Sequence, residues 1–461
     1  MMFLALRVAP LIAALALTPA SAFEPAGRAA RLCAPAAEGA PAAQNAPKAK
    51  AGAEAEAEAN GDLKPVLSTS DLRKLTAIFE DIFEARREGE SDLKPRQGLE
   101  EFINGFEGKR GETRSFLSLV PDIELALRGA TTYKDSGVQK GRVKQEKKTE
   151  SFGGEIQYAV LAPGRYSSKT AYPLILSIPA LGETLDEHLK THWTDTALRD
   201  GAIIAAVGMP SDLEMWDTMG SAENGGGVVR AMHVFREVRN AYNVDIERVF
   251  IAGKGDGVAA ALTIASLFPD RFAGVIGRNG DASDLSPLNF KNLPVMFAGA
   301  GEKASAFAKA AEGMSNAPVA IAPDATDTDV WSWMADRRRA ANPSSVALRP
   351  TLWQGNKAYW LEVIGVDPNN LRPAEATIDR ATNTVTVKAD GVLEVRVYFN
   401  DRLVDMSAPV RVIVNGVEHE HTIERRLRTM LDLAWQTGDF GRVYTSERVY
   451  DVPVVTGGDG S

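Results

Sequence analysis

The stretch from Val249 to Leu262 constrains the fold more than any other part of the chain. It begins with an apolar run, passes through a turn with three alternate glycines, and continues as an alanine-rich segment that ends near Phe268-Pro269-Asp270. The apolar run predicts a strand and the alanine-rich segment predicts a helix. A strand that enters a helix through so short a turn is typical of a parallel sheet covered by helices.

The turn has the spacing of a nucleophile elbow, Gly-x-Ser-x-Gly, in which a strand-turn-helix unit raises a reactive hydroxyl above an α/β sheet. Its five residues here are Gly253, Lys254, Gly255, Asp256 and Gly257, so glycine stands at the centre. Glycine adopts the elbow conformation without the roughly 1 to 3 kcal/mol that a side chain incurs there. The sequence therefore predicts the backbone of the motif without its nucleophile.

Strand and helix patterns alternate on both sides of this turn. Expected strands cover residues 173–178, 202–207, 248–252, 272–276, 294–298 and 319–322, and expected helices cover 184–199, 228–242, 304–314 and 329–339. Apolar strands separated by amphipathic helices predict an α/β fold, with a mostly parallel sheet and helices on both faces.

With the elbow and the continuation Phe268-Pro269-Asp270-Arg271-Phe272-Ala273-Gly274-Val275 in view, residues 155–340 resemble the α/β-hydrolase superfamily. The nearest branch resembles secreted esterases and polyhydroxybutyrate-depolymerase-like proteins, some of which carry a β-rich C-terminal appendage. The resemblance would place the nucleophile at Gly255, the acid at Glu302 and the histidine in loop 323–329, which contains no histidine. A Ser-His-acid triad needs a hydroxyl within reach of an imidazole, so the resemblance implies a degenerate triad.

Other groups at the elbow have simpler interpretations. Asp256 follows the centre of the turn and is expected to be a helix N-terminal carboxylate, as is Glu302 in the next unit. Lys254 precedes the centre, where side chains usually point away from a pocket, so a catalytic lysine is the less favoured interpretation. No catalytic residue is assigned.

The histidines offer weak signals. His188 and His192 have the four-residue spacing of metal ligands, and Glu183, Asp186 or Glu187 could supply a third ligand. Such a pair more often belongs to a helix surface, so no metal site and no cofactor are predicted. The others are His233, and His419 with His421 on a predicted solvated strand edge.

The flanking segments define the remaining organisation. Residues 1–22 have the charge, apolar run and Ala-Ser-Ala site of a signal peptide, which predicts export to the periplasm or the extracellular space. Cys33, the single cysteine, is expected to be an unpaired thiol in a disordered Ala/Pro/Glu-rich tether. The expected units are 1–22 (signal peptide), 23–66 (tether), 67–150 (helical unit and linker, including the basic stretch 140–148), 151–345 (α/β-hydrolase-like domain) and 346–461 (β-rich domain). The helical unit is expected to pack on the domain that follows it.

The net charge of −9 is spread along the chain, which argues against nucleic-acid binding, and no later apolar run could span a membrane. The first hypothesis is an exported, non-catalytic homologue that binds a ligand, glycan or partner protein. The second is a rearranged hydrolase, with Ser177, Ser211 or Ser221 as nucleophile and His188 or His233 as base. A Ser–His distance within about 3 Å would favour it. A third hypothesis is a purely structural role, which a large exposed apolar patch would favour.

Overall fold

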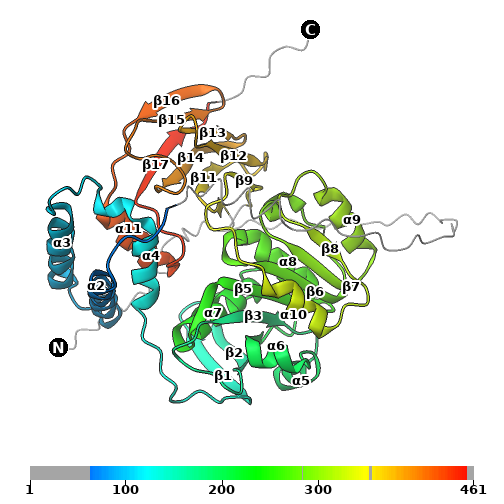
Figure 1. Ribbon diagram of the computed structural model, residues 1–461. Coiled ribbons are helices and arrows are strands. Elements are labelled where there is room, and N and C mark those ends of the chain that lie inside the picture. Colours follow the sequence, from blue (N-terminus) through cyan, green and yellow to red (C-terminus); the bar gives the residue numbers. More distant parts are fainter. Residues whose placement is uncertain (1–62, 283, 352–355, 454–461) are drawn as a thin grey trace, which may run out of the picture.

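The computed structural model describes residues 63–282, 284–351 and 356–453. Figure 1 shows three parts in chain order: a group of helices in blue and cyan, an α/β domain in green, and a β-rich domain in yellow to red. The predicted signal peptide, Cys33, residues 23–62 of the predicted tether and the C-terminal Gly-Asp-Gly lie outside the described residues.

An eight-stranded sheet forms the centre of the molecule, in the order β1-β2-β4-β3-β5-β6-β7-β8. β2 pairs antiparallel with both β1 and β4, and every pair from β4 to β8 is parallel. Its strands are β1 (Val143–Glu150), β2 (Gly154–Leu161), β3 (Tyr172–Ile178), β4 (Ile203–Val207), β5 (Val244–Lys254), β6 (Gly274–Gly280), β7 (Val295–Ala300) and β8 (Val319–Ile321). This is a mixed α/β fold with a large, mostly parallel sheet, as the sequence predicted.

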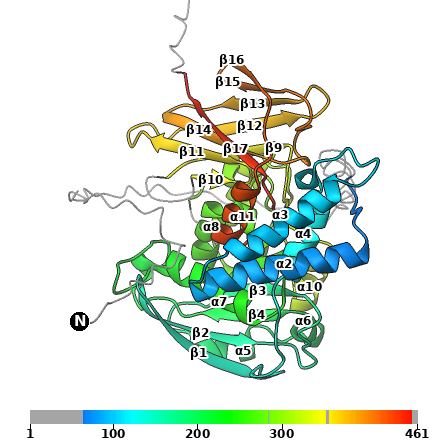
Figure 2. The same cartoon turned by 90° about the vertical axis from the view of Figure 1, so that its left-hand side faces the viewer.

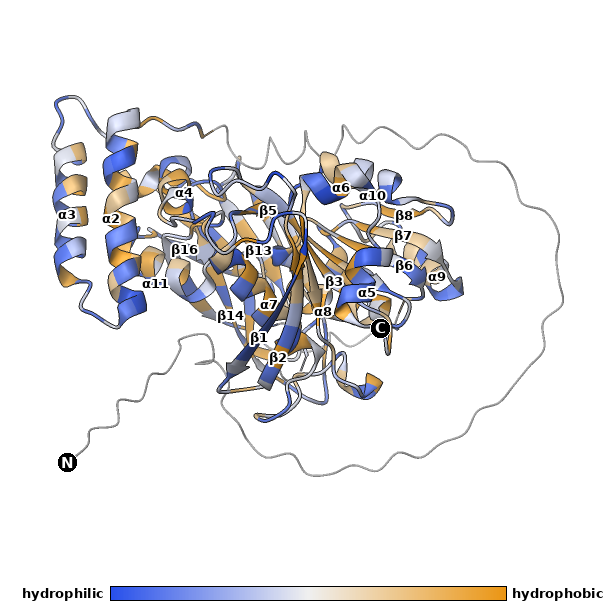
Figure 3. Cartoon of the chain, turned by 90° about the horizontal axis from the view of Figure 1, so that it is seen from below, coloured by the Kyte–Doolittle hydropathy of each residue, from blue (hydrophilic) through white to orange (hydrophobic). Residues whose placement is uncertain are grey.

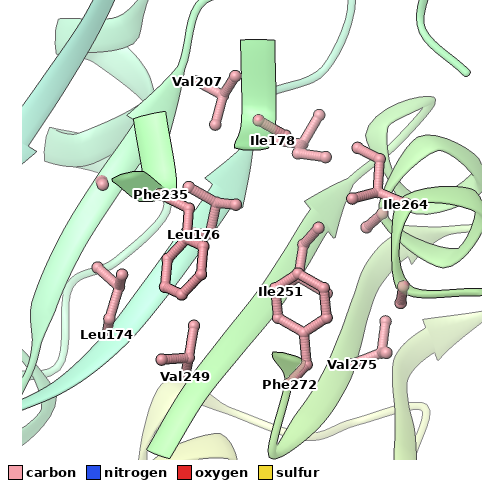
Figure 4. Close-up of a cluster of buried hydrophobic side chains, with 14 of the residues drawn as sticks. Leu174, Leu176, Ile178, Val207, Phe235, Val249, Ile251, Ile264, Phe272 and Val275 are labelled. Carbon is pink, nitrogen blue, oxygen red and sulfur yellow. The ribbon is translucent and has the colours of Figure 1, made fainter. Parts of the chain in front are cut away.

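Helices cover both faces of the sheet because successive strand side chains point to opposite faces. Leu174, Leu176 and Ile178 of β3 join the core under α7, α8 and α9, part of which Figure 4 shows. Ile175 joins the core under α5, α6 and α10. These helices are α5 (Leu185–Thr191), α6 (Thr196–Gly201), α7 (Gly227–Ala241), α8 (Gly257–Leu267), α9 (Glu302–Ala311) and α10 (Asp327–Ala335), with short 3₁₀ turns η2 (Leu213–Met215), η3 (Pro269–Arg271) and η4 (Pro287–Phe290).

Two segments differ from the sequence-based prediction. Residues 143–150 are not a linker but the edge strand β1, which pairs with β2 along its whole length. Figure 3 shows β1 in blue, because its side chains are mostly charged and suit an exposed sheet edge. The single helix predicted over 184–199 is two helices, since the Asp195 carboxylate accepts the Leu198 amide at 2.8 Å and starts a new helix.

The β-rich domain is a sandwich of two sheets around one core. One sheet has the order β10-β11-β14-β17 and the other β16-β15-β13-β12-β9. Asn415 and Gly416, both at positive φ, form the tight turn that joins β15 to β16. The strands are β9 (Ser345–Leu348), β10 (Lys357–Ala358), β11 (Leu361–Val366), β12 (Ala374–Asp379), β13 (Thr384–Lys388), β14 (Val392–Phe399), β15 (Val410–Val414), β16 (Val417–His421) and β17 (Ser446–Asp451).

The N-terminal helices pack on a different partner from the one predicted. They are α2 (Thr69–Glu88), α3 (Leu93–Glu107), η1 (Phe116–Ser118) and α4 (Val120–Gly129). Their apolar faces form one core with Met430, Leu431 and Ala434 of α11 (Leu427–Thr437), which belongs to the C-terminal domain. Figure 2 shows α11 beside these helices. The sequence could not indicate this because the partner lies some 300 residues along the chain.

Buried ion pairs join the α/β domain to the C-terminal domain. Asp439 accepts from Arg339 at 2.6 Å and from Arg442 at 3.1 Å, and Arg442 also pairs with Asp270. Arg339 pairs in addition with Glu247 at 3.1 Å. Although burial alone would raise the pKa of Asp439, the surrounding arginines hold that pKa well below its ordinary value. These charges therefore fix the relative position of the two domains.

Across the described ranges, no helix combines the length and the apolar character needed to cross a membrane.

Candidate functional site

The elbow has the backbone that the sequence predicted. β5 ends at Lys254, α8 begins at Gly257, and Gly255 between them has φ +54°. The Gly255 amide donates to the carbonyl of Arg278 on the neighbouring strand β6 at 3.0 Å. At Gly253 a Cβ would lie 2.1 Å from the carbonyl oxygen of Gly257, so that glycine is required by close packing. The turn is thus intact, and its central position carries no side chain.

A chain of polar side chains lies next to the elbow. Ser177 Oγ of β3 is 2.7 Å from His188 Nε2, and His188 Nδ1 is 2.9 Å from Glu183 Oε2. Glu183 Oε1 accepts from Lys254 Nζ at 2.6 Å. Trp193 Nε1 donates to Ser177 Oγ at 2.9 Å, which directs the serine hydrogen toward His188 Nε2. We call Ser177, His188, Glu183 and Lys254 the polar relay.

The electrostatics of the polar relay keep its imidazole neutral. Burial lowers the pKa of His188, and the Glu183 carboxylate opposes that effect only in part. Burial would raise the pKa of Glu183, but hydrogen bonds from Lys254 and His188 hold it below its ordinary value. The carboxylate is therefore ionised beside the lysine, and neutral His188 carries its hydrogen on Nδ1.

The polar relay is sealed from solvent at its serine end. Ser177, His188 and Trp193 are each 0% exposed, and Ser177 lies within a strand rather than on a turn. Ser177, His188 and Glu183 are hydrogen-bonded in the order hydroxyl, base and acid, but the Ser177 hydroxyl is not accessible to a substrate.

His188 and His192 are not on a helix surface, contrary to the sequence-based interpretation. Both are buried, and their rings stack with centroids 4.8 Å apart. Both nitrogens of His188 are already hydrogen-bonded, so it has no free ligand atom for a metal ion. Burial, with the nearby positive charge of Arg278, lowers the pKa of His192 to about 2. The spacing that resembled a metal motif serves ring packing instead.

The loop expected to hold the base, residues 323–329, instead contains a carboxylate, Asp327, whose oxygens are already bonded within the protein. Asp327, the first residue of α10, accepts the Thr194 amide at 2.6 Å and the Asp195 amide at 3.1 Å, and it pairs with Arg278. Burial would raise the pKa of Asp327, but the Thr194 amide and the Arg278 charge keep it below the ordinary value. Asp327 thus ties α10 to the segment between α5 and α6.

The remaining predicted residues do not converge on the elbow. Asp256 is exposed at the start of α8, and its side chain makes no capping hydrogen bond. Glu302 is exposed at the first position of α9. Ser211 and Ser221 are exposed, and within the described ranges neither bonds to a histidine. His419 and His421 lie half-buried on strand β16 near Tyr450, at the edge predicted for them.

His233 lies on α7 among charged groups that resemble a metal cluster. Ligand atoms of Glu150, His233 and Glu237 lie within 4.8 Å of one another. The guanidinium of Arg236 lies between them, 2.7 Å from the Glu150 carboxylate and 3.0 Å from His233 Nδ1. This guanidinium occupies the position that a bound cation would take.

A cleft of about 800 Å³ opens against the loop between β3 and α5, whose Ala180 adjoins Gly255 of the elbow. The loop between β3 and α5 forms one wall, including Glu183 of the polar relay. Gln145, Glu155 and Gln157 of β1 and β2 form another wall, and Met209 and Trp216 contribute apolar surface. The cleft therefore reaches the acid end of the polar relay.

Sequence reasoning missed the partners that hold these groups in place. Arg278 was not considered, yet it contacts the elbow, His192 and Asp327. Trp193 follows His192 directly in the sequence and belongs to no motif. The signal that could have identified the network is a serine inside an otherwise apolar strand, because a buried hydroxyl requires partners.

Comparison with known proteins gives only distant structural likeness. No protein-family model matches the chain, and no curated protein matches it. Among solved structures, a thermostable esterase is 15% identical with a TM-score of 0.36, covering 43% of this chain and 63% of the esterase. A CE1 ferulic acid esterase from Anaeromyces mucronatus is 11% identical with a TM-score of 0.35, covering 45% of this chain and 94% of that one. An S-formylglutathione hydrolase from Agrobacterium tumefaciens is 15% identical with a TM-score of 0.32, covering 42% and 94%.

These structures are hydrolases by name, and each match leaves more than half of this chain unmatched. Likeness at this level carries no statement about activity.

Proposed function

We propose that this chain is an exported, non-catalytic homologue of the α/β-hydrolases, of the secreted-esterase or polyhydroxybutyrate-depolymerase-like type, that binds a ligand in the cleft beside its elbow. The observation that carries the proposal is Gly255 at the centre of an intact elbow, at φ +54° and without a side chain. The turn has the backbone of the motif, in a conformation that would strain a side chain, and it lacks the reactive group.

The polar relay supports a structural role for Ser177. A nucleophile must come within about 3 to 3.5 Å of the atom it attacks. Ser177 has no exposed surface, and its hydroxyl is held between Trp193 and His188. These hydrogen bonds satisfy a buried hydroxyl, a buried indole and a buried imidazole at once.

The chemistry of the cleft favours a neutral ligand rich in hydroxyl groups, such as a glycan. Its charged side chains are already paired: Glu183 with Lys254, and Glu155 with Lys147 at 3.2 Å. Arg230 donates to the backbone carbonyls of Gly208 and Gly225. Gln157 Nε2 donates to Glu155 at 2.8 Å, which leaves the amide oxygen of Gln157 for a ligand. That oxygen, the Gln145 amide and loop backbone groups suit hydroxyls better than ions.

Three measurements test this proposal, the first two on the purified mature chain. Hydrolysis of short acyl esters should stay at background, and turnover abolished by a serine-reactive phosphonate would contradict the non-catalytic assignment. Binding of soluble oligosaccharides should weaken at least tenfold in Gln157→Ala, while Gln97→Ala on α3 provides a matched control far from the cleft. Export is tested by mass spectrometry of the secreted chain, which should begin at Phe23.

The second candidate is a rearranged hydrolase, favoured by the Ser177–His188 distance of 2.7 Å. This distance meets the criterion of about 3 Å, and Glu183 completes the order of a triad. Catalysis would require Trp193 and α5 to move away from Ser177. Covalent labelling of Ser177 by a fluorophosphonate, located by peptide mapping, would establish this candidate in place of the first.

A further inference from the structure

A second cavity, of about 270 Å³, lies between α7, the end of α8 and the end of α11. We call it the α7 pocket. The end of α11 adjoins α7, since Arg239 donates to the carbonyls of Thr437 and Gly438. The α7 pocket shares no lining residue with the cleft beside the elbow. It lies at a domain boundary, where ligand sites commonly occur.

The wall of the α7 pocket is mainly apolar. Phe152, Met232, Phe235 and Phe268 are among its lining residues, with valines from the start of α7. Its volume lies near the lower end of the range for small-molecule sites, about 300 to 1,000 Å³. The pocket therefore suits a small ligand with an alkyl or aryl part.

One hydrogen-bond donor in the wall has no partner. His233 is 5% exposed, and its Nε2 atom is buried without a hydrogen bond in the described structure. Arg236 Nη2 lies 3.0 Å from His233 Nδ1. The Glu150 carboxylate lies farther from Nδ1, at 3.3 Å, and is itself bonded by Arg236 at 2.7 Å. Because a guanidinium can only donate, we assign Nδ1 as the acceptor and place the ring hydrogen on Nε2. A buried N–H group without an acceptor costs free energy, so a ligand that supplied an acceptor to His233 Nε2 would gain affinity.

The charge of the wall is positive. Three arginines, Arg236, Arg239 and Arg271, line the α7 pocket together with one carboxylate, Glu150. Arg236 pairs with Glu150 and Arg271 pairs with Asp439. Within the described ranges, Arg239 forms no ion pair and donates instead to the carbonyls of Thr437 and Gly438. Burial and the nearby charge of Arg271 lower the pKa of Arg239 to about 10, and the more distant Asp439 carboxylate offsets this lowering only in part.

We propose that the α7 pocket binds a small amphiphilic carboxylate, whose apolar part lies against Met232 and Phe268 and whose carboxylate accepts from His233 Nε2 near Arg239. A neutral alcohol or an amine would fit this wall less well than a carboxylate does. An alcohol lacks the charge that Arg239 would offset, and a protonated amine offers His233 no acceptor and is repelled by the arginines.

The experiment uses the mature full-length chain and octanoate as the probe, with octanol and octylamine as matched controls. Calorimetry should show one site for octanoate, with octanol and octylamine at least tenfold weaker. His233→Phe keeps the shape and removes the donor, so octanoate affinity should fall at least tenfold. His419→Phe on β16 is the matched control and should bind octanoate as the unmodified chain does.

Met232→Trp gives an independent test because it fills the pocket rather than changing its polarity. This variant should abolish octanoate binding, and it keeps the proposal testable if His233→Phe does not fold. Equal binding of octanoate and octanol, unchanged affinity in either pocket variant, or no binding of octanoate at millimolar concentration would each overturn the proposal.

Discussion

Replacing Gly255 by serine restores the missing hydroxyl and measures the strain of the elbow. Gly255 has φ +54°, and a non-glycine residue in this left-handed region costs about 1–2 kcal/mol. The added Cβ would lie 3.3 Å from the Cβ of Ala180, a tighter contact than van der Waals packing normally gives. Together these effects predict a loss of about 1–3 kcal/mol in the free energy of unfolding.

Urea denaturation and calorimetry would measure this loss. For a domain of this size, 1 kcal/mol lowers Tm by about 2–4 °C, so Gly255→Ser should melt roughly 2–12 °C lower. Gly182→Ser provides a matched control, because Gly182 also has positive φ, +78°, but nothing lies within 4 Å of an added Cβ. The difference between the two variants isolates the contact with Ala180.

The Gly255→Ser variant should also remain inactive toward short acyl esters. A hydroxyl alone lacks a base, since His188 is already engaged by Ser177 and Glu183, and loop 323–329 contains no histidine. Esterase activity in this single variant would show that a nearby imidazole serves as base. If Gly255→Ser had the same free energy of unfolding as the unmodified chain, the argument that a side chain at this position is strained would be refuted.

Three further predictions concern the framework around the site. Asp439→Asn should cost about 3–5 kcal/mol in urea denaturation at pH 7, because it removes the carboxylate that Arg339 and Arg442 share and leaves one buried positive charge of the cluster uncompensated. Arginines hold the folded-state pKa of Asp439 low, so the unmodified chain should lose this stabilisation as pH falls below about 4. The difference in free energy of unfolding between the unmodified chain and Asp439→Asn should therefore become smaller at that pH. Ser177→Ala should cost about 1–3 kcal/mol, measured in the same way, because Trp193 Nε1 loses its acceptor. Removal of residues 1–60 should leave the calorimetric Tm unchanged, and a large drop would contradict the predicted tether.

Local patterns made the order of elements predictable. The apolar run before Gly253 and the alanine-rich run after Gly257 indicated the end of β5 and the start of α8 correctly. The edge strand β1 was missed because its lysines and glutamates lack apolar alternation, although its pairing with β2 satisfies its backbone. The break between α5 and α6 was missed because Asp195 begins a new helix inside an otherwise continuous pattern.

The candidate site was only partly predictable. Ser177 and His188 were weighed as a nucleophile and a base, but spacing alone could not show that they meet. Their contact depends on the angle at which α5 crosses the end of β3. The partners Trp193 and Arg278 carry no motif, and their roles follow from packing alone.

The sequence by itself determined the alternation of strands and helices, the glycine at the centre of the elbow and the absence of histidine from the loop after β8. These features depend on residue type and on periodic patterns over a few neighbouring residues, both of which are present in the sequence itself. Only the tertiary structure decided that Ser177 is sealed under Trp193, that α11 completes the core of the N-terminal helices, and that His233 faces an apolar pocket. Each of these depends on side chains from separate elements meeting in space, and no local pattern records which surfaces will be buried against each other.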